Sequence, residues 1–256
     1  MIGISTTCCS DVSLGTALYK ISRVGGIDFI EIVSENYHML DRYNWRFHLE
    51  TLEGRGLKNV IHAPFSDINI ASLNEKIRRA SLDILFETFE VAQSMGSLLV
   101  VIHPGHLSPA SMRFPKAYEK IHKRSLEEIE RYSRSLGIRV AVENMPAFPI
   151  LDGRTCERIQ ELVAGTELYV AFDVGHLNTV TRNFREFVDL LGDRIIHVHL
   201  HDNDGNTDSH LGLGKGSVPW EEVLKILPRK ASWSLELGSL DAAMESMEFV
   251  KMHLQT

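Results

Sequence analysis

The sequence has little cysteine and no long apolar run. Its 256 residues include three cysteines, Cys8, Cys9 and Cys156, of which two are adjacent. This count and spacing fit neither a disulfide framework nor a CxxC pair, so we expect a reducing environment. No apolar stretch reaches the roughly 18 residues that a membrane span needs. The first residues lack a basic segment followed by an apolar one, so we predict a cytoplasmic protein without a signal peptide.

The chain also lacks a large excess of either charge. It carries 27 Lys and Arg against 34 Asp and Glu, a formal net charge of −7. A negative balance speaks against a polyanionic partner such as nucleic acid. We find no linker, low-complexity tract or charge block, and the composition is 44% hydrophobic and 24% charged. These features predict one globular domain over residues 1–256.

Short apolar segments rich in β-branched residues alternate with longer amphipathic segments along the chain. The expected strands are Ile2–Thr6, Phe29–Val33, Asn59–Ala63, Leu98–Pro104, Arg139–Asn144, Tyr169–Val174, Ile195–His201 and Ser232–Leu237. The expected helices are Leu14–Val24, Arg42–Arg55, Asn74–Met95, Lys116–Leu136, Thr155–Val163, Phe184–Leu191, Trp220–Ile226 and Asp241–Leu254. Strand–helix alternation implies parallel pairing with right-handed crossovers. Eight such units, without a GxGxxG after the first strand, predict an α/β protein with a single (β/α)8 TIM barrel.

Ionisable residues stand at the carboxyl ends of most expected strands, where a buried strand is otherwise apolar. Barrel enzymes place their chemistry at this end. The residues are His62, His103, Glu143, Asp173, His176, His199 and Glu236, and Asp208 and His210 follow in the loop after the seventh strand. Almost no Lys or Arg accompanies them, and a cluster of carboxylates and imidazoles is costly unless a cation lies among them. The set therefore predicts a metal site.

The number and type of donors limit the metals. Nine donors exceed the four or five that one zinc ion takes, so we expect either several ions or one principal site with weaker neighbours. Nitrogen and oxygen ligands without thiolate suit Zn, Mn, Co or Fe(II). We predict one to three divalent ions per chain. Four other histidines are assigned differently: His38 and His197 to core packing, His106 and His201 to the surroundings of the site.

These motifs, each at its own strand and in order, make the chain resemble the xylose isomerase-like barrel superfamily, which includes endonuclease IV and the sugar isomerases and epimerases. The resemblance covers nearly the whole chain. It implies that Glu143, Asp173, His199 and Glu236 form the common metal set. In the ketose epimerase branch the two glutamates also act as acid and base. The other five residues complete the nine-residue pattern of the trinuclear zinc endonucleases; they are His62, His103, His176, Asp208 and His210.

Other segments resemble the sugar isomerase branch more closely. Residues 25–32 place Glu31 on the second strand, as in that branch. The endonuclease pattern has asparagine where this chain has His201, and the loop 64–67 lacks the bulky pair that those enzymes insert into DNA. The loops of the mouth carry more acidic than basic residues, whereas binding of duplex DNA needs basic residues that contact its phosphates. The loop residues are Glu35, Asp67, Asp152, Asp202, Asp204 and Asp208 against Arg113, Lys116 and Lys215.

Two enzymatic functions follow, and the first is favoured. It is a metal-dependent isomerase or epimerase acting on a small sugar, sugar phosphate or related hydroxy-carbonyl compound. Glu143 and Glu236 would move a proton through an enediolate, and His176 would position the substrate. The segment Gly212–Gly216 would form either a phosphate cradle or a turn.

The alternative is a multinuclear-zinc phosphodiesterase, either an abasic-site endonuclease or a small-phosphoester hydrolase. A barrel without activity ranks last, because both glutamates are present. We expect a small-molecule substrate and no membrane. Nucleic acid is disfavoured as a partner but stays open with the endonuclease alternative, and the oligomeric state stays open as well.

Overall fold

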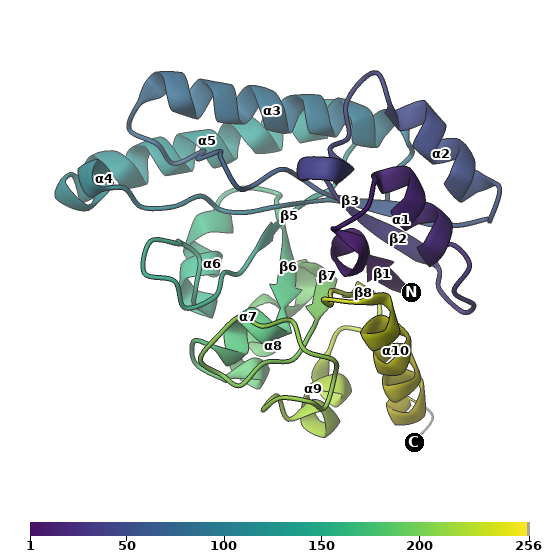
Figure 1. Cartoon of the computed structure of the whole chain (residues 1–256). Helices are drawn as coiled ribbons and strands as arrows, with labels where there is room; N and C mark the ends of the chain where they lie inside the picture. The colour runs from purple at the N-terminus through teal and green to yellow at the C-terminus, as the bar shows by residue number, and fades with distance from the viewer. Residues whose placement is uncertain (255–256) are drawn as a thin grey trace.

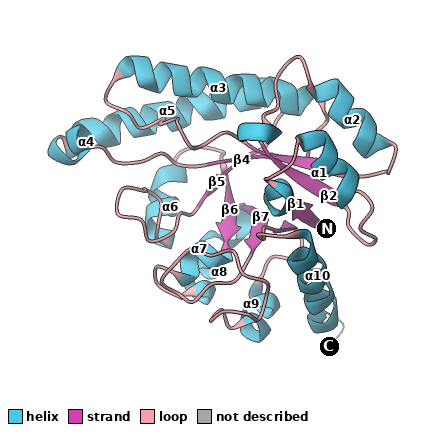
Figure 2. Ribbon diagram, viewed as in Figure 1, coloured by secondary structure: helices cyan, strands magenta, loops and turns pink. Residues whose placement is uncertain are grey.

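The computed structural model describes residues 1–254, in which eight parallel strands close into a barrel (Figures 1 and 2). Each strand pairs with the next along the chain, and β8 returns to pair with β1. This confirms the predicted (β/α)8 TIM barrel. The strands are β1 (Ile2–Ser5), β2 (Phe29–Val33), β3 (Lys58–His62), β4 (Val100–Ile102), β5 (Val140–Glu143), β6 (Tyr169–Asp173), β7 (Ile195–Leu200) and β8 (Ser232–Leu235). Residues 255 and 256 of the expected domain lie outside the described residues.

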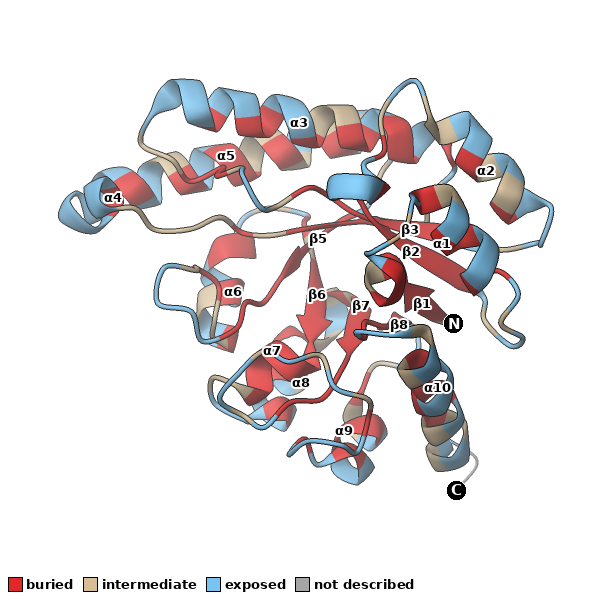
Figure 3. Cartoon of the chain, in the orientation of Figure 1, coloured by how far each residue is buried: buried red, intermediate tan, exposed pale blue. Residues whose placement is uncertain are grey.

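Helices surround the barrel, buried on the side that faces the strands and exposed on the other (Figure 3). The two longest, α3 and α5, run side by side in Figure 1. The α-helices are α1 (Leu14–Ile21), α2 (Trp45–Glu53), α3 (Glu75–Ser94), α4 (Pro109–Arg113), α5 (Pro115–Leu136), α6 (Cys156–Val163), α7 (Val174–Asn178), α8 (Phe184–Leu191), α9 (Trp220–Ile226) and α10 (Leu240–Leu254). Short 3-10 helices are η1 (Thr6–Cys9), η2 (Asn36–His38) and η3 (Gly192–Arg194). Among the described residues, no helix is long and apolar enough to span a membrane.

Local hydrogen bonds explain where the helices differ from the predicted ranges. The helix expected from Arg42 begins at Trp45, because the Asp41 carboxylate accepts the backbone N–H groups of Tyr43 and Asn44 and folds a turn there. The short helix α7 was not predicted. Asp173, the last residue of β6, accepts the N–H of His176 at 2.6 Å and so caps a helix directly after the strand.

The barrel interior has an apolar lower layer beneath a polar upper layer. Side chains alternate between the two faces of a strand, so residues two apart share a face. Phe29, Val60, Val101, Ala141 and Ala171 belong to one buried apolar cluster. They stand two residues before Glu31, His62, His103, Glu143 and Asp173 respectively. These later residues therefore point inward, at the carboxyl ends of the strands. Gly3 leaves room for the lower layer, because a Cβ there would lie 2.6 Å from the Phe29 ring.

Candidate metal centre

All nine predicted site residues converge at the mouth of the barrel. They form three groups in which one donor atom per residue lies within 4.8 Å of the others. The groups are His62, His103 and Glu143; Glu143, Asp173, His199 and Glu236; and His176, Asp208 and His210, which His201 joins. Glu143 belongs to two groups and links them. The convergence was predicted; the role of these residues as ligands stays a prediction.

Glu143, the last residue of β5, lies at the centre of the site. Its Oε2 is 3.1 Å from His62 Nε2 and 3.2 Å from His103 Nε2. Its Oε1 is 2.8 Å from His199 Nδ1. Burial alone would raise the pKa of Glu143, but the charge of His199 and hydrogen bonds from the imidazoles hold it well below its usual value. The carboxylate is thus ionised, buried and surrounded by imidazole nitrogens.

The second group extends from Glu143 towards β6 and β8. His199 Nδ1 lies 3.5 Å from Asp173 Oδ2 and 3.3 Å from Glu236 Oε2. Burial disfavours the imidazolium, yet the charges of Glu31, Glu143 and Glu236 raise the pKa of His199 well above its usual value. In the metal-free protein a proton therefore neutralises part of the negative charge that a divalent cation would otherwise neutralise.

The third group is built around Asp208, in the loop after β7. Its Oδ2 lies 3.2 Å from His176 Nε2 and 3.5 Å from His210 Nε2. Its Oδ1 is buried without a hydrogen-bond partner among the described residues. Burial lowers the pKa of His210, but the hydrogen bond to Asp208 and the charge of Glu236 outweigh it and raise the pKa to about 9. An unpartnered buried oxygen beside two imidazoles fits a divalent cation.

Glu31 and His197 lie beneath the second group and were not predicted as part of the site. Glu31 Oε1 is 3.0 Å from His199 Nε2 and 3.3 Å from His197 Nε2, and all three residues are fully buried. By accepting the Nε2 proton, Glu31 leaves Nδ1 of His199 directed at the carboxylates above. His197 is buried as predicted, and its Nδ1 also contacts Ser232 Oγ at 2.7 Å. Strand alternation would have found Glu31, since it shares the inward face of β2 with Phe29.

His201 lies between the second and third groups. Its Nε2 is 3.0 Å from Asp173 Oδ1, and its ring stacks on His210 with centroids 3.9 Å apart. The planes of the two rings are nearly parallel, at an angle of 6°. Since His201 also belongs to the third donor group, its assignment to the surroundings of the site rather than to the ligands stays a prediction. Gly175 makes the position available, since a Cβ there would collide with the His201 ring.

Several acidic residues assigned to the mouth have internal partners instead, which corrects the predicted negative rim. Asp202 is fully buried and accepts hydrogen bonds from Trp220 Nε1 at 2.9 Å and from the N–H groups of Gly214 and Val218. The segment Gly212–Gly216 is therefore a turn around this carboxylate rather than a free phosphate cradle. Glu35 likewise accepts the N–H groups of Phe65 and Ser66.

A cavity of about 440 Å³ opens above the donor groups. Its size falls in the range of small-molecule sites. Seven of the nine predicted residues line it, together with His106, Ser66 and a set of apolar residues. The apolar set is Phe65, Met145, Pro146, Phe148, Ile150 and Leu151. No Lys or Arg of the described chain is part of this lining.

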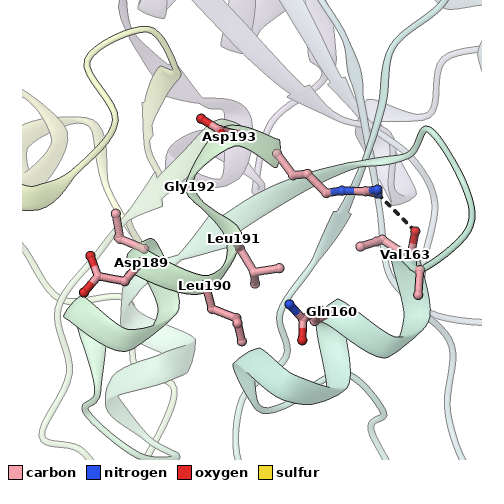
Figure 4. Close-up of a pocket in the computed structure, with 10 residues that line it drawn as sticks. Gln160, Val163, Asp189, Leu190, Leu191, Gly192 and Asp193 are labelled. Carbon is pink, nitrogen blue, oxygen red and sulfur yellow. Dashed lines mark hydrogen bonds between the residues drawn. The ribbon is translucent and has the colours of Figure 1, made fainter.

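A larger cavity of about 650 Å³ lies at the other end of the barrel, between α6 and the segment of α8 and η3 (Figure 4). It adjoins the residues that lead into β6 and β7. Its one lining arginine, Arg194, donates to the carbonyl groups of Val163, Thr166 and Leu168. This cavity contains none of the predicted site residues, and barrel enzymes rarely use this end.

Comparison with known proteins gives the following similarities. Residues 19–252 match the family described as "Xylose isomerase-like TIM barrel". An uncharacterized protein of Methanocaldococcus jannaschii is 34% identical over 262 residues, 99% of this chain and 89% of that protein. Fructoselysine 3-epimerase of Escherichia coli is 26% identical over 160 residues, 59% of this chain and 56% of that enzyme.

Solved structures extend the comparison. The crystal structure of a D-tagatose 3-epimerase-like protein superposes with a TM-score of 0.93 at 33% identity, over 99% of this chain and 97% of that one. Endonuclease IV from Thermus thermophilus superposes with a TM-score of 0.74 at 20% identity, over 99% and 98%. The second match shows the fold alone.

Proposed function

The chain belongs to the xylose isomerase-like TIM barrel family, and we propose that it is a divalent-metal-dependent epimerase or isomerase of a small sugar or related hydroxy-carbonyl compound. The observation that carries the proposal is the pairing of two carboxylates, Glu143 and Glu236, at the floor of a cavity lined without Lys or Arg. Similarity to a protein named D-tagatose 3-epimerase-like and to fructoselysine 3-epimerase supports it.

The donor groups fit a metal because buried carboxylates meet imidazoles there without a Lys or Arg in the lining. Glu143, Asp173, His199 and Glu236 would hold the principal ion, and the remaining predicted residues one or two more of the type Zn, Mn or Co. A bound divalent ion would polarise the carbonyl and the neighbouring hydroxyl of the substrate.

The residues around the ion would carry out the proton transfers. In the proposed reaction, one glutamate takes the proton from the carbon next to the carbonyl, and the electron pair moves to the carbonyl oxygen to give an enediolate. The other glutamate, in its acid form, returns a proton to the opposite face of the same carbon, which inverts it. Glu143, held ionised by its imidazole contacts, would be the proton acceptor, and Glu236, which has fewer such contacts, would be the glutamate that carries the proton. His176, in the cavity lining, would orient a substrate hydroxyl.

The proposal is tested by incubating the metal-loaded protein with ketohexoses in deuterium oxide. We expect deuterium at the carbon next to the carbonyl and formation of the epimer or isomer. Glu236→Gln should lower the rate about 10²- to 10⁴-fold, the contribution of a general acid or base. Glu221→Gln, at an exposed glutamate of α9, serves as the matched control and should exchange at the wild-type rate. Absence of exchange with any ketose in the fully loaded protein contradicts the proposal.

A multinuclear-zinc phosphodiesterase is the second candidate, favoured by the third donor group around Asp208. A phosphodiester substrate would place negative charge in a cavity without Lys or Arg, where only the metals could neutralise it. The two functions differ in their dependence on Asp208. Cleavage of an abasic duplex or a small phosphodiester, lost in Asp208→Asn, would replace the first proposal. Exchange that persists in Asp208→Asn would support it.

A further inference from the structure

One part of the cavity lining has no role in holding a metal. Phe148 and Ile150, in the loop between β5 and α6, line the same cavity as the donor groups but are 57% and 52% exposed. Contiguous apolar surface rimmed by polar residues marks a ligand groove or an interaction site, and these two side chains continue the apolar lining of the cavity. Deeper apolar residues of the same lining are less exposed: Met145 is buried and Phe65 is half-buried, stacked on His103. The apolar surface thus extends from the donor groups outward to the rim.

The loop that carries these side chains is held in place rather than free. Asp152, next in the loop, is buried and accepts hydrogen bonds from Tyr118 Oη and from Arg158 Nε and Nη2, each at 2.8 Å. The N–H of Leu107 donates to the carbonyl of Ile150 at 2.7 Å, and that of Leu151 to Phe148 at 3.0 Å. The rim surface is therefore ordered before any ligand arrives, which lowers the entropic cost of binding on it.

The charges of the cavity exclude one class of ligand from this rim. Its ionisable residues are the carboxylates Glu143, Asp208 and Glu236 with the histidines around them, and no described Lys or Arg is in the lining. A phosphate group outside the metals would meet no fixed cation there. An uncharged, apolar group would instead cover Phe148 and Ile150 and remove their surface from water.

We infer that the substrate is an unphosphorylated hydroxy-ketone bearing an apolar substituent that binds against Phe148 and Ile150. This inference rests on the proposed function and specifies its substrate class. The hydroxy-ketone lies over the donor groups and contacts Phe65 and Met145. The substituent extends to the rim.

The test compares D-fructose, its benzyl ethers at O1 and at O6, and D-fructose 6-phosphate, all with the metal-loaded protein. We expect at least one ether to have the highest kcat/KM and the phosphate the lowest. Phe148→Ala and Ile150→Ala should each lower the ratio of kcat/KM for that ether to kcat/KM for free fructose about tenfold, the effect of uncovering half of a large apolar side chain. Phe114→Ala, at a phenylalanine of 54% exposure outside the cavity, is the matched control and should keep the wild-type ratio.

Calorimetric binding of the same four compounds separates this inference from the proposed function. If none is turned over but an ether binds at least tenfold more tightly than free fructose, and Phe148→Ala removes that preference, the substrate class holds and the reaction is wrong. Equal affinity of ethers and free fructose, or preference for the phosphate, overturns the inference. So does a change in oligomeric state on Phe148→Ala, because a second copy of the chain would then be the occupant of the rim.

Discussion

Replacing Glu31 by glutamine is expected to weaken metal binding without removing any predicted ligand. Glu31 accepts the Nε2 proton of His199 at 3.0 Å and so directs Nδ1 towards Glu143, Asp173 and Glu236. Glutamine keeps an acceptor oxygen but loses the negative charge. Its amide group would take the place of Glu31 Oε2, a buried atom with no hydrogen-bond partner in the described chain.

The expected losses of metal affinity and of stability each have a typical size. A side chain that accepts a hydrogen bond from a metal-binding histidine contributes about 10- to 100-fold to metal affinity, or about 1.4–2.7 kcal/mol. Burying an amide without an acceptor costs a further ~1–3 kcal/mol of folding free energy. Glu31→Gln should therefore lower the affinity for the tightest ion and, separately, lower the stability of the metal-free protein.

Competition with a chromophoric chelator at fixed pH measures the dissociation constant, and urea unfolding measures the stability. Glu128→Gln is the matched control, because Glu128 pairs with the buried Arg78 at 3.2 Å between α3 and α5, away from the site. It should reduce stability and leave metal affinity at the wild-type value. If Glu31→Gln also leaves the affinity within about threefold of wild type, well short of the expected contribution, Glu31 does not position His199.

Two further predictions concern stability. Asp152→Asn should destabilise the protein by about 3 kcal/mol in urea unfolding, the lower end for a broken buried ion pair, because Arg158 retains Glu119 and Glu161 as partners; an effect below ~1 kcal/mol would contradict the anchoring role of Asp152. The pKa of His210 is raised from 6.5 to about 9, so its stabilising contribution is complete below pH 6.5 and is lost as the pH rises through 9. The metal-free protein should lose up to ~3 kcal/mol across this interval, and the zinc-loaded protein, whose histidines are already deprotonated, should not. Equal pH profiles of the two forms would show that His210 does not bind metal.

The barrel and the convergence of the nine residues were predictable because both depend on local order along the chain. The β-branched segments mark strands, and parallel strands in a barrel bring their carboxyl ends together. Seven of the nine predicted donors stand at or just after such an end, so their neighbours follow from the topology, whereas Asp208 and His210 lie further along the loop after β7. The same logic extends to Glu31, whose inward direction is fixed by its spacing from Phe29.

The partners of the acidic loop residues were not predictable in this way. Asp202 is enclosed by Trp220 and by the turn 212–216, and Asp152 by Tyr118 of α5 and Arg158 of α6. These contacts depend on how loops and helices pack, and composition does not encode that packing. From the sequence, a carboxylate on a loop is expected to be solvent-exposed. Asp152 and Asp202 are instead buried and accept hydrogen bonds that hold their loops in place.

Two parts of the cavity therefore have different roles, one in metal binding and the other in the choice of substrate. The donor groups would determine whether metals bind, and divalent ions held there would support either proton transfer at carbon or displacement at phosphorus. The reaction depends on which molecule can lie over them, and the lining controls that choice. A cavity with Phe148 and Ile150 at its rim and no Lys or Arg in its lining favours an uncharged substrate over a phosphodiester. If the donor groups alone decided the reaction, exchanging Ile150 for arginine would leave substrate preference unchanged. If the lining decides it, that single positive charge should raise kcat/KM for D-fructose 6-phosphate relative to its benzyl ether.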